Sequence, residues 1–198
     1  MRALYLASAS PRRAELLAQI GVRFSRLVFP GINETPRAGE APADYVQRMA
    51  REKAIAGRAA LDGVPQAAVL GADTSVVLGE RILGKPADRD DARQMLQALS
   101  GTVHEVLSAV SVLTPDGQQT RLSTTRVWFR DLDSAEIDTY LATGEPFDKA
   151  GAYGIQGCGA VLVDALHGSY SGVVGLPLAE TRALLHWANV PYWQQDPA

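Results

Sequence analysis

"EVLSAVSVLTPDGQQTRLSTTRVWFR", residues 105–130, is the segment that says most about the fold. Both halves have the composition of long β-strands. In the second half polar and apolar residues alternate, as they do in a strand with one buried face. The Pro-Asp-Gly sequence at 115–117 is typical of a turn between two strands. The segment therefore predicts a long antiparallel hairpin in the middle of the chain.

Strands and helices are interspersed on both sides of this hairpin. Further strands are expected at 3–8, 24–29, 67–73, 159–166 and 171–176, with a short hairpin over 74–84. Helices are expected at 11–20, 44–61, 90–101, 134–144 and 177–189. Because an antiparallel hairpin lies among alternating strands and helices, the expected fold class is α/β with a mixed twisted sheet.

Length and composition indicate one folded domain. The 198 residues contain no linker rich in proline, glycine or serine, so we expect a single domain over 1–198. The chain has 46% apolar and 21% charged residues, which is ordinary for a globular protein. A net charge of −3 offers no basic surface for nucleic acid or an anionic membrane. Any bound anion must therefore be held by a local cluster of positive charge.

Cysteine content and hydropathy bear on the compartment. Cys158 is the only cysteine, which excludes a disulfide within the chain and favours a reducing environment. No apolar run approaches the roughly 20 residues of a membrane span. The first residues do not have the form of a cleaved signal peptide. We therefore expect a cytoplasmic protein.

The sequence SASPRR at 8–13 follows the first predicted strand and begins a helix. Helix N-termini carry free N–H groups and the positive end of a dipole, which attract anions. Ser8 and Ser10 add hydroxyl donors, whereas Arg12 and Arg13 place positive charge where the dipole disfavours it. A serine-capped helix with two solvated arginines is the alternative that needs no ligand. A bound phosphate chain explains the two arginines better, and we expect one here.

Lysine is rare in this chain. Sixteen of the 19 basic residues are arginine, and only Lys53, Lys85 and Lys149 are lysine. Lysine supplies a compact point charge on a flexible stem, although chance on an arginine-rich background also explains three residues. The segment GERILGKP at 79–86 matches the start of a phosphate-loop motif, but Pro86 stands where Ser or Thr would hold magnesium. We therefore reject a Walker-type loop and expect Lys85 to contact a phosphate from a hairpin.

Two acidic residues are candidates for catalysis. Asp73 lies at the predicted end of the strand 67–73, and strand ends in α/β sheets line ligand crevices. An acid there can hold a metal or activate a water, while a turn-capping aspartate is the alternative. Glu34 supplies a second acid after the second predicted strand. A glycine-rich loop over 147–159 carries Gln156, although such loops often serve only to turn the chain.

Several motifs taken together resemble one known family. The segments LYLASASPRRAELLAQIG, REKA, GADTSVVLGERILGKP, EPFDKAGAYGIQG and GSYSGVVGLPL occur in this order over almost the whole chain. They resemble the Maf family of nucleoside triphosphate pyrophosphatases. The resemblance implies two lobes around a central cleft, in a fold similar to that of inosine triphosphatase. It also implies a homodimer and hydrolysis of a nucleoside triphosphate to the monophosphate and pyrophosphate with a divalent cation, Mg²⁺ or Mn²⁺.

The resemblance implies a role for each candidate residue. Asp73 would be the proton acceptor, and Asp73 and Glu34 would hold the metal. The triphosphate would be bound by Ser8, Arg13, Lys53 and Lys85, and base specificity would depend on Arg12, Thr74 and Gln156. One position departs from the family, because several members have a second acid where this chain has Asn33. The neutral side chain removes a negative charge that would otherwise favour a metal.

The sequence KAGAYGIQG at 149–157 resembles that of the family branch that acts on dTTP and UTP. The branch that acts on 7-methyl-GTP tends to carry Trp, Gln and Glu at the places of Arg12, Thr74 and Gln156. We therefore expect hydrolysis of dTTP and UTP. A pyrophosphatase for modified purine nucleotides is one alternative, and a non-catalytic nucleotide-binding regulator of cell division is another.

Overall fold

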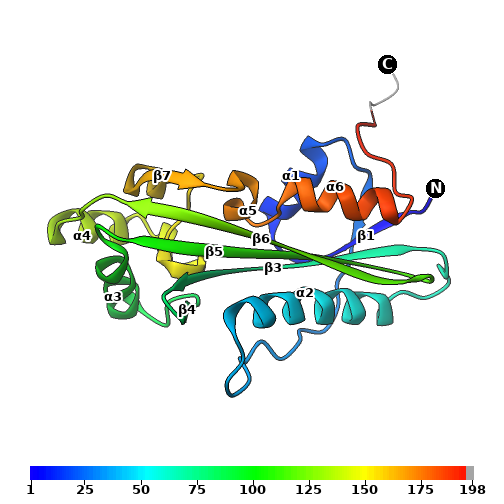
Figure 1. Ribbon diagram of the computed structural model, residues 1–198, viewed down its shortest axis with the longest axis horizontal. Helices are drawn as coiled ribbons and strands as arrows, with labels where there is room; N and C mark the ends of the chain where they lie inside the picture. The colour runs from blue at the N-terminus through cyan, green and yellow to red at the C-terminus, as the bar shows by residue number, and fades with distance from the viewer. Residues whose placement is uncertain (195–198) are drawn as a thin grey trace.

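The computed structural model describes residues 1–194, and Figure 1 shows its single mixed sheet. The seven strands have the order β2-β1-β3-β5-β6-β7, with β4 paired to β3. They are β1 (Leu4–Ala7), β2 (Phe24–Arg26), β3 (Ala68–Leu78), β4 (Arg81–Leu83), β5 (Val103–Thr114), β6 (Gly117–Phe129) and β7 (Val163–His167). β1 runs parallel to β2 and β3, and the other pairs are antiparallel. The expected mixed α/β class is confirmed.

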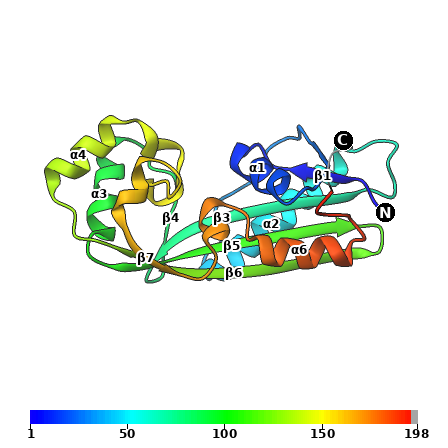
Figure 2. The same cartoon turned by 90° about the horizontal axis from the view of Figure 1, so that it is seen from above.

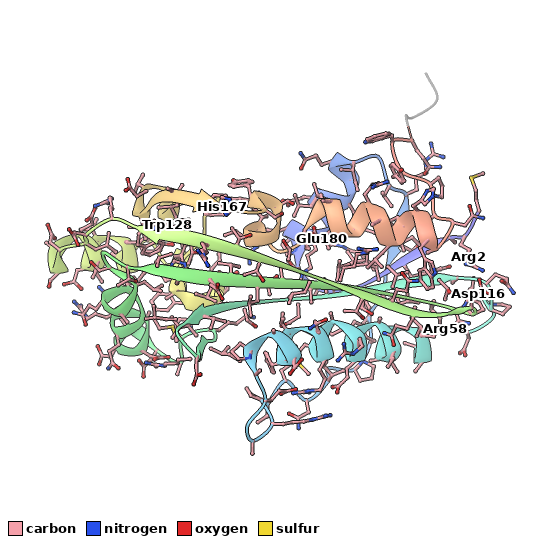
Figure 3. All side chains as sticks on the ribbon, viewed as in Figure 1. Arg2, Arg58, Asp116, Trp128, His167 and Glu180 are labelled. Carbon is pink, nitrogen blue, oxygen red and sulfur yellow. The ribbon has the colours of Figure 1, made fainter. Side chains whose placement is uncertain are left out.

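β5 and β6 form the long hairpin expected in the middle of the chain. They pair from Val103 opposite Trp128 to Thr114 opposite Gly117. The turn between them is tied to the N-terminal segment, because Arg2 Nη2 donates to Asp116 Oδ2 at 2.5 Å. Figure 3 shows Arg2 and Asp116 together at the end of the molecule where the hairpin turns. The hairpin thus extends along the long axis of the molecule (Figure 1).

The helices gather toward the two ends of the long strands. They are α1 (Pro11–Gln19), α2 (Pro42–Ala59), α3 (Arg89–Leu99), α4 (Ser134–Ala142), α5 (Tyr170–Val174) and α6 (Leu178–Trp187). In Figure 2, α3 and α4 lie at one end, and α1, α2 and α6 lie at the other. β3, β5 and β6 extend through both groups, so the fold has two lobes on one sheet. Within residues 1–194, no helix has the length and apolar character needed to cross a bilayer.

Two hydrophobic clusters cover the two faces of the sheet. The larger one joins Leu70 and Val110 on the central strands to Leu96 of α3 and Leu184 of α6, so it continues through both lobes. Figure 1 shows α2 on the other face of the sheet, and its Met49 belongs to the smaller cluster there. The two lobes therefore share one core.

One predicted strand end is wrong. β3 continues to Leu78, so Asp73 lies inside a strand and not at its end. The reason is non-local, because β5 pairs with β3 as far as Val77 opposite Glu105. β4 then returns along β3, which confirms the short hairpin expected over 74–84.

The strand predicted at 171–176 is also wrong, since α5 (Tyr170–Val174) occupies most of it. The Ser169 hydroxyl accepts from the Gly172 N–H at 3.0 Å and caps this single turn. Part of the strand predicted at 159–166 is a 3₁₀ turn, Cys158–Leu162, before β7 begins. In both segments local hydrogen bonds override the β preference of the valines.

Candidate active site

Three charged side chains from separate elements meet in the cleft between the lobes. Lys53 of α2 places its Nζ 2.8 Å from Oδ1 of Asp73 and 2.8 Å from Oε1 of Glu34. The side chains of Lys53 and Asp73 are 13% and 11% exposed, whereas that of Glu34 is 58% exposed. One ammonium group therefore bridges two carboxylates at the edge of the solvent.

Close packing of α2 on β3 allows this meeting. Gly71 lies two residues before Asp73, and a Cβ there would come within 2.4 Å of the Ala50 carbonyl oxygen and 2.5 Å of the Ala54 nitrogen. Only glycine lets the helix backbone come this near to the strand. Lys53, one residue before Ala54, is consequently held over Asp73.

The loop that carries Glu34 is fixed by residues at the start of α2. The Tyr45 hydroxyl donates to the Glu34 carbonyl at 2.8 Å, and Arg48 Nη2 donates to the Thr35 carbonyl at 3.2 Å. Arg48 is itself held by Glu40, with Nε–Oε1 at 2.5 Å and Nη2–Oε2 at 2.7 Å. This bidentate pair is about nine-tenths buried and fixes both ends of the loop.

The Glu40 carboxyl and the Tyr45 phenol each keep the protonation state that their hydrogen bonds require. Hydrogen bonds from Arg48 lower the pKa of the Glu40 carboxyl to about 2, so the ion pair persists at neutral pH. Burial, together with the nearby Asp73 and Glu34 carboxylates, raises the pKa of Tyr45 to about 12. The phenol therefore keeps the proton that it donates to the Glu34 backbone.

Asn33 does not share the orientation of Glu34. Its Oδ1 accepts from the Thr35 N–H at 2.9 Å and so forms a local turn. The Asn33 side chain thus forms a hydrogen bond inside the loop, while the neighbouring Glu34 lines the cleft.

The SASPRR turn lies beside the acidic pair. Ser10 occupies the N-cap of α1, but its side chain makes no capping hydrogen bond, and its N–H donates instead to Ser8 Oγ at 3.2 Å. Arg13 donates to Ser8 Oγ at 3.1 Å, to the Gly175 carbonyl at 2.9 Å and to Thr74 Oγ1 at 3.5 Å. Arg13 thus links α1 to the residue after β1, to β3 and to the end of α5.

Two cavities adjoin at this turn. The larger, of about 780 Å³, is lined by Ser8, Glu34, Lys53, Asp73 and Lys85. The smaller, of about 310 Å³, is lined by Thr74, Tyr153 and Gln156 among others. Arg12 and Arg13 line both cavities. The structure therefore brings every candidate residue from the sequence analysis to the lining of these two adjoining cavities.

The smaller cavity has mixed walls. Val76, Val106 and Tyr153 contribute apolar surface, while Thr74 and Gln156 contribute polar groups. Arg12 Nη2 lies 4.0 Å from Asp148 Oδ2 in the lining of the larger cavity, so the two lobes approach each other there. A cavity with both apolar and polar walls suits a flat, partly polar ring.

Sequence reasoning missed the residues that hold the site together. Arg48 and Glu40 stand in no motif, and arginine is usually exposed, so nothing in the sequence marked the pair as buried. Tyr45 stands in no motif either. Glu145 and Tyr140, which contact the glycine-rich loop, were likewise given no function.

The donor set of the cleft fits a hard divalent cation. Within residues 1–194, no three His, Cys, Asp or Glu side chains are grouped to hold a metal. Mg²⁺ is usually bound by one or two carboxylates together with waters and substrate phosphates. Glu34 and Asp73 already converge on one cation, the Lys53 ammonium, at 2.8 Å each. These two side chains would supply the carboxylate part of such a site.

The family model and the curated relatives agree on one family. The model of the Maf-like protein family matches residues 3–188. A protein of Alcanivorax borkumensis named dTTP/UTP pyrophosphatase is 60% identical over 193 residues, covering 98% of this chain and 99% of that protein. One of Shewanella sp. (strain MR-7), with the same name, is 54% identical and covers 94% and 98% of the two chains. A solved nucleoside-triphosphatase / dITP/XTP pyrophosphatase from Mycobacterium abscessus aligns over 94% of each chain, with 16% identity and a TM-score of 0.44.

Proposed function

This chain belongs to the Maf-like protein family, and on that premise we propose that it hydrolyses dTTP and UTP to the nucleoside monophosphate and pyrophosphate. The near full-length relatives named dTTP/UTP pyrophosphatase support this substrate choice. The structural observation that carries the proposal is the pair of adjoining cavities. The larger contains the Glu34, Asp73 and Lys53 cluster, the smaller contains Thr74 and Gln156 beside apolar side chains, and two arginines line both.

The larger cavity would hold the triphosphate. Ser8 would donate a hydroxyl hydrogen bond, while Arg13, Lys53 and Lys85 would face the phosphate oxygens. Lys53 is already nine-tenths buried and charge-paired, so only a strongly anionic ligand would draw its ammonium away from Asp73. These groups would orient the chain and offset its charge, which supplies much of the acceleration in phosphoryl chemistry.

Glu34 and Asp73 would hold a divalent metal, Mg²⁺ or Mn²⁺. Such an ion, when bound, supplies positive charge against the phosphate oxygens and makes nearby water more acidic. Asp73 lies deeper in the cleft than Glu34, with 11% against 58% of its side chain exposed. We assign Asp73 the task of accepting the proton of the water that attacks the α-phosphorus. Pyrophosphate is then the leaving group.

The smaller cavity would hold the base. A Gln side chain offers one acceptor and two donors, so Gln156 can form two hydrogen bonds with the N3–H and a carbonyl of uracil or thymine. Thr74 adds a hydroxyl to the lining of this cavity, and Arg12, which lines both cavities, would lie between the base and the phosphates. The cavity volume of about 310 Å³ suits a single ring better than a large ligand.

Pyrophosphate release from a nucleotide panel tests this proposal. We expect dTTP and UTP to be the best substrates, with Mg²⁺ or Mn²⁺ required. Preference for 7-methyl-GTP or another modified purine would replace the substrate assignment. Binding of nucleotides without any release of pyrophosphate would indicate a regulatory protein and overturn the enzyme assignment.

The proposal extends to the state of the protein in the cell. We propose a single two-lobed domain, a homodimer and a cytoplasmic location. The shared core of the two lobes supports the first, and the family resemblance supports the second. Analytical ultracentrifugation at several concentrations tests the dimer.

A further inference from the structure

The loop that carries Gln156 is pressed against the side chains of Tyr140 in α4 and of Glu145 just after this helix. It spans 154–159, with the sequence GIQGCG. A Cβ at Gly157 would lie 2.0 Å from Glu145 Oε2, and one at Gly159 would lie 2.6 Å from Tyr140 Oη. The glycines therefore allow the loop backbone to contact Glu145 and Tyr140 directly.

Four hydrogen bonds join these two side chains to each other and to both ends of the loop. Glu145 Oε1 accepts from Tyr140 Oη at 2.8 Å and from the Gly159 N–H at 2.9 Å. Its Oε2 accepts from the Cys158 N–H at 2.8 Å. Tyr140 Oη in turn accepts from the Gly154 N–H at 3.1 Å. Glu145 thus holds one end of the loop, and Tyr140 holds the other.

The charge states of the pair fix the direction of these bonds. Burial, the largest single effect, raises the pKa of the Glu145 carboxyl, but hydrogen bonds from Gly159, Tyr140 and Cys158 outweigh it and leave the pKa lowered. Burial and the hydrogen bond to Glu145 raise the pKa of the Tyr140 phenol. At neutral pH the carboxylate therefore only accepts, and the phenol remains a donor.

Glu145 lines the smaller cavity beside Gln156, yet its three accepted hydrogen bonds are directed at the protein and not at the cavity. From this arrangement we infer that Glu145 and Tyr140 form a positioning pair, which holds the Gln156 loop in place and thereby sets base selectivity. The inference rests on the proposed function, because it assumes that Gln156 faces the base.

Selectivity is the property that this pair would control most. Two hydrogen bonds to a pyrimidine edge require the Gln156 amide to be placed within a fraction of an ångström, whereas apolar contact with a ring tolerates displacement. A misplacement of about 1 Å can cost roughly 100-fold in rate. A loosened loop would therefore lose its preference for dTTP and UTP before it lost the ability to bind nucleotides.

Amide hydrogen exchange measured by NMR tests the positioning pair without any reaction. Glu145→Gln keeps the shape of the side chain but presents an NH₂ group to backbone N–H donors. We expect the Cys158 and Gly159 amides to exchange at least roughly tenfold faster in this variant. Tyr140→Phe should likewise speed exchange of the Gly154 amide. This variant tests the inference by itself if Glu145→Gln does not fold. Glu136→Gln, which breaks a surface ion pair with Arg130 in the same lobe, is the matched control and should leave all three amides unchanged.

Unchanged exchange at these amides in both variants would overturn the inference. Faster exchange throughout the lobe would also contradict it, because that result indicates general destabilisation and not a local clamp. Neither measurement depends on the nucleotide that the protein uses.

A double-mutant cycle connects the loop to substrate choice. We expect Glu145→Gln to lower the ratio of kcat/KM for dTTP to kcat/KM for GTP by roughly tenfold. In a Gln156→Ala background the same change should have almost no further effect on this ratio, because the two residues act through one loop. Additive effects would show that Glu145 contacts the base itself and would contradict the positioning role. If the wild type hydrolysed no nucleotide, the proposed function would fail, while the exchange result would still decide whether the pair holds the loop.

Discussion

Nζ of Lys53 lies 2.8 Å from Oδ1 of Asp73, although the two residues belong to different elements and are 20 positions apart in the chain. Both side chains are nearly nine-tenths buried. An unpaired charge at that depth would be costly, and each of the two charges offsets the free-energy cost of burying the other. The approach of α2 to β3 creates this pair, and Gly71 makes the approach possible.

Gly71→Ala should therefore damage both stability and activity. The added Cβ would meet backbone atoms of Ala50 and Ala54 at 2.4 and 2.5 Å, which cannot move aside as a side chain can. Overpacking of this kind costs about 1–3 kcal/mol, and α2 would be displaced together with Lys53. Urea unfolding and pyrophosphate release measure the two effects. Gly84→Ala, which has no atom within 4 Å of its Cβ, is the control and should change stability by less than about 0.5 kcal/mol.

Lys85→Ala separates a phosphate contact from an incidental surface charge. Lys85 is exposed and lines the larger cavity, so its removal should leave the folded state intact, with a change below about 0.5 kcal/mol. We expect kcat/KM for dTTP to fall severely. Arg81→Ala on the adjacent strand β4 removes an exposed positive charge outside the lining of either cavity, and it should keep wild-type kinetics. Equal kinetics in the two variants would mean that lysine occurs at position 85 by chance and does not contact a phosphate.

The Arg48–Glu40 pair should contribute stability that depends on pH. The pKa of Glu40 is lowered from 4.5 to about 2 in the folded protein, so the folded state binds its proton less readily than the unfolded state does. The contribution is thus fully present above about pH 4.5 and is lost as the pH falls toward 2. Glu40→Gln should be less stable than the wild type at pH 6, and the difference in unfolding free energy should shrink between pH 4.5 and 2. A difference that stayed constant over this range would refute the assignment.

Gln156→Glu tests the residue that we place against the base. An ionised carboxylate can only accept, so it would face a pyrimidine carbonyl with an unpaired negative charge. We expect kcat/KM for dTTP and UTP to fall by at least roughly tenfold, or about 1.4 kcal/mol. Guanine presents two adjacent donors, so GTP should lose less or gain. Parallel kinetics with dTTP, UTP, CTP and GTP measure this change, and a uniform loss would mean that Gln156 only supports the loop.

The sequence was sufficient to select residues that the fold brings to one cleft, but not to give their geometry. Ser8, Arg13, Asp73 and Lys85 each stand in a short motif, and the structure places all of them on one cleft. The position of Asp73 within β3 was missed because a strand ends where its partner stops pairing, and β5 lies more than 30 residues further along the chain. No local pattern contains that information.

The supporting residues were missed for a related reason. α2 contains several arginines, and all of them suit a solvated helix face. Arg48 is the one that becomes buried, because the loop before the helix folds back and brings Glu40 against it. Likewise, the valines of 171–176 favour a strand, but a capping hydrogen bond from Gly172 to Ser169 makes a helical turn more stable there.

The most direct test of the central claim is pyrophosphate release from dTTP by Asp73→Asn, measured beside the wild type with Mg²⁺ or Mn²⁺. Asparagine keeps the size of the side chain but cannot accept the proton of an attacking water. Lys53 retains Glu34 as a partner at 2.8 Å, so the variant should fold and still bind dTTP. We expect kcat to fall by roughly 10²–10⁴-fold with dTTP binding largely unchanged. A variant that kept wild-type kcat would show that Asp73 is not the proton acceptor and would contradict the mechanism proposed for this cleft.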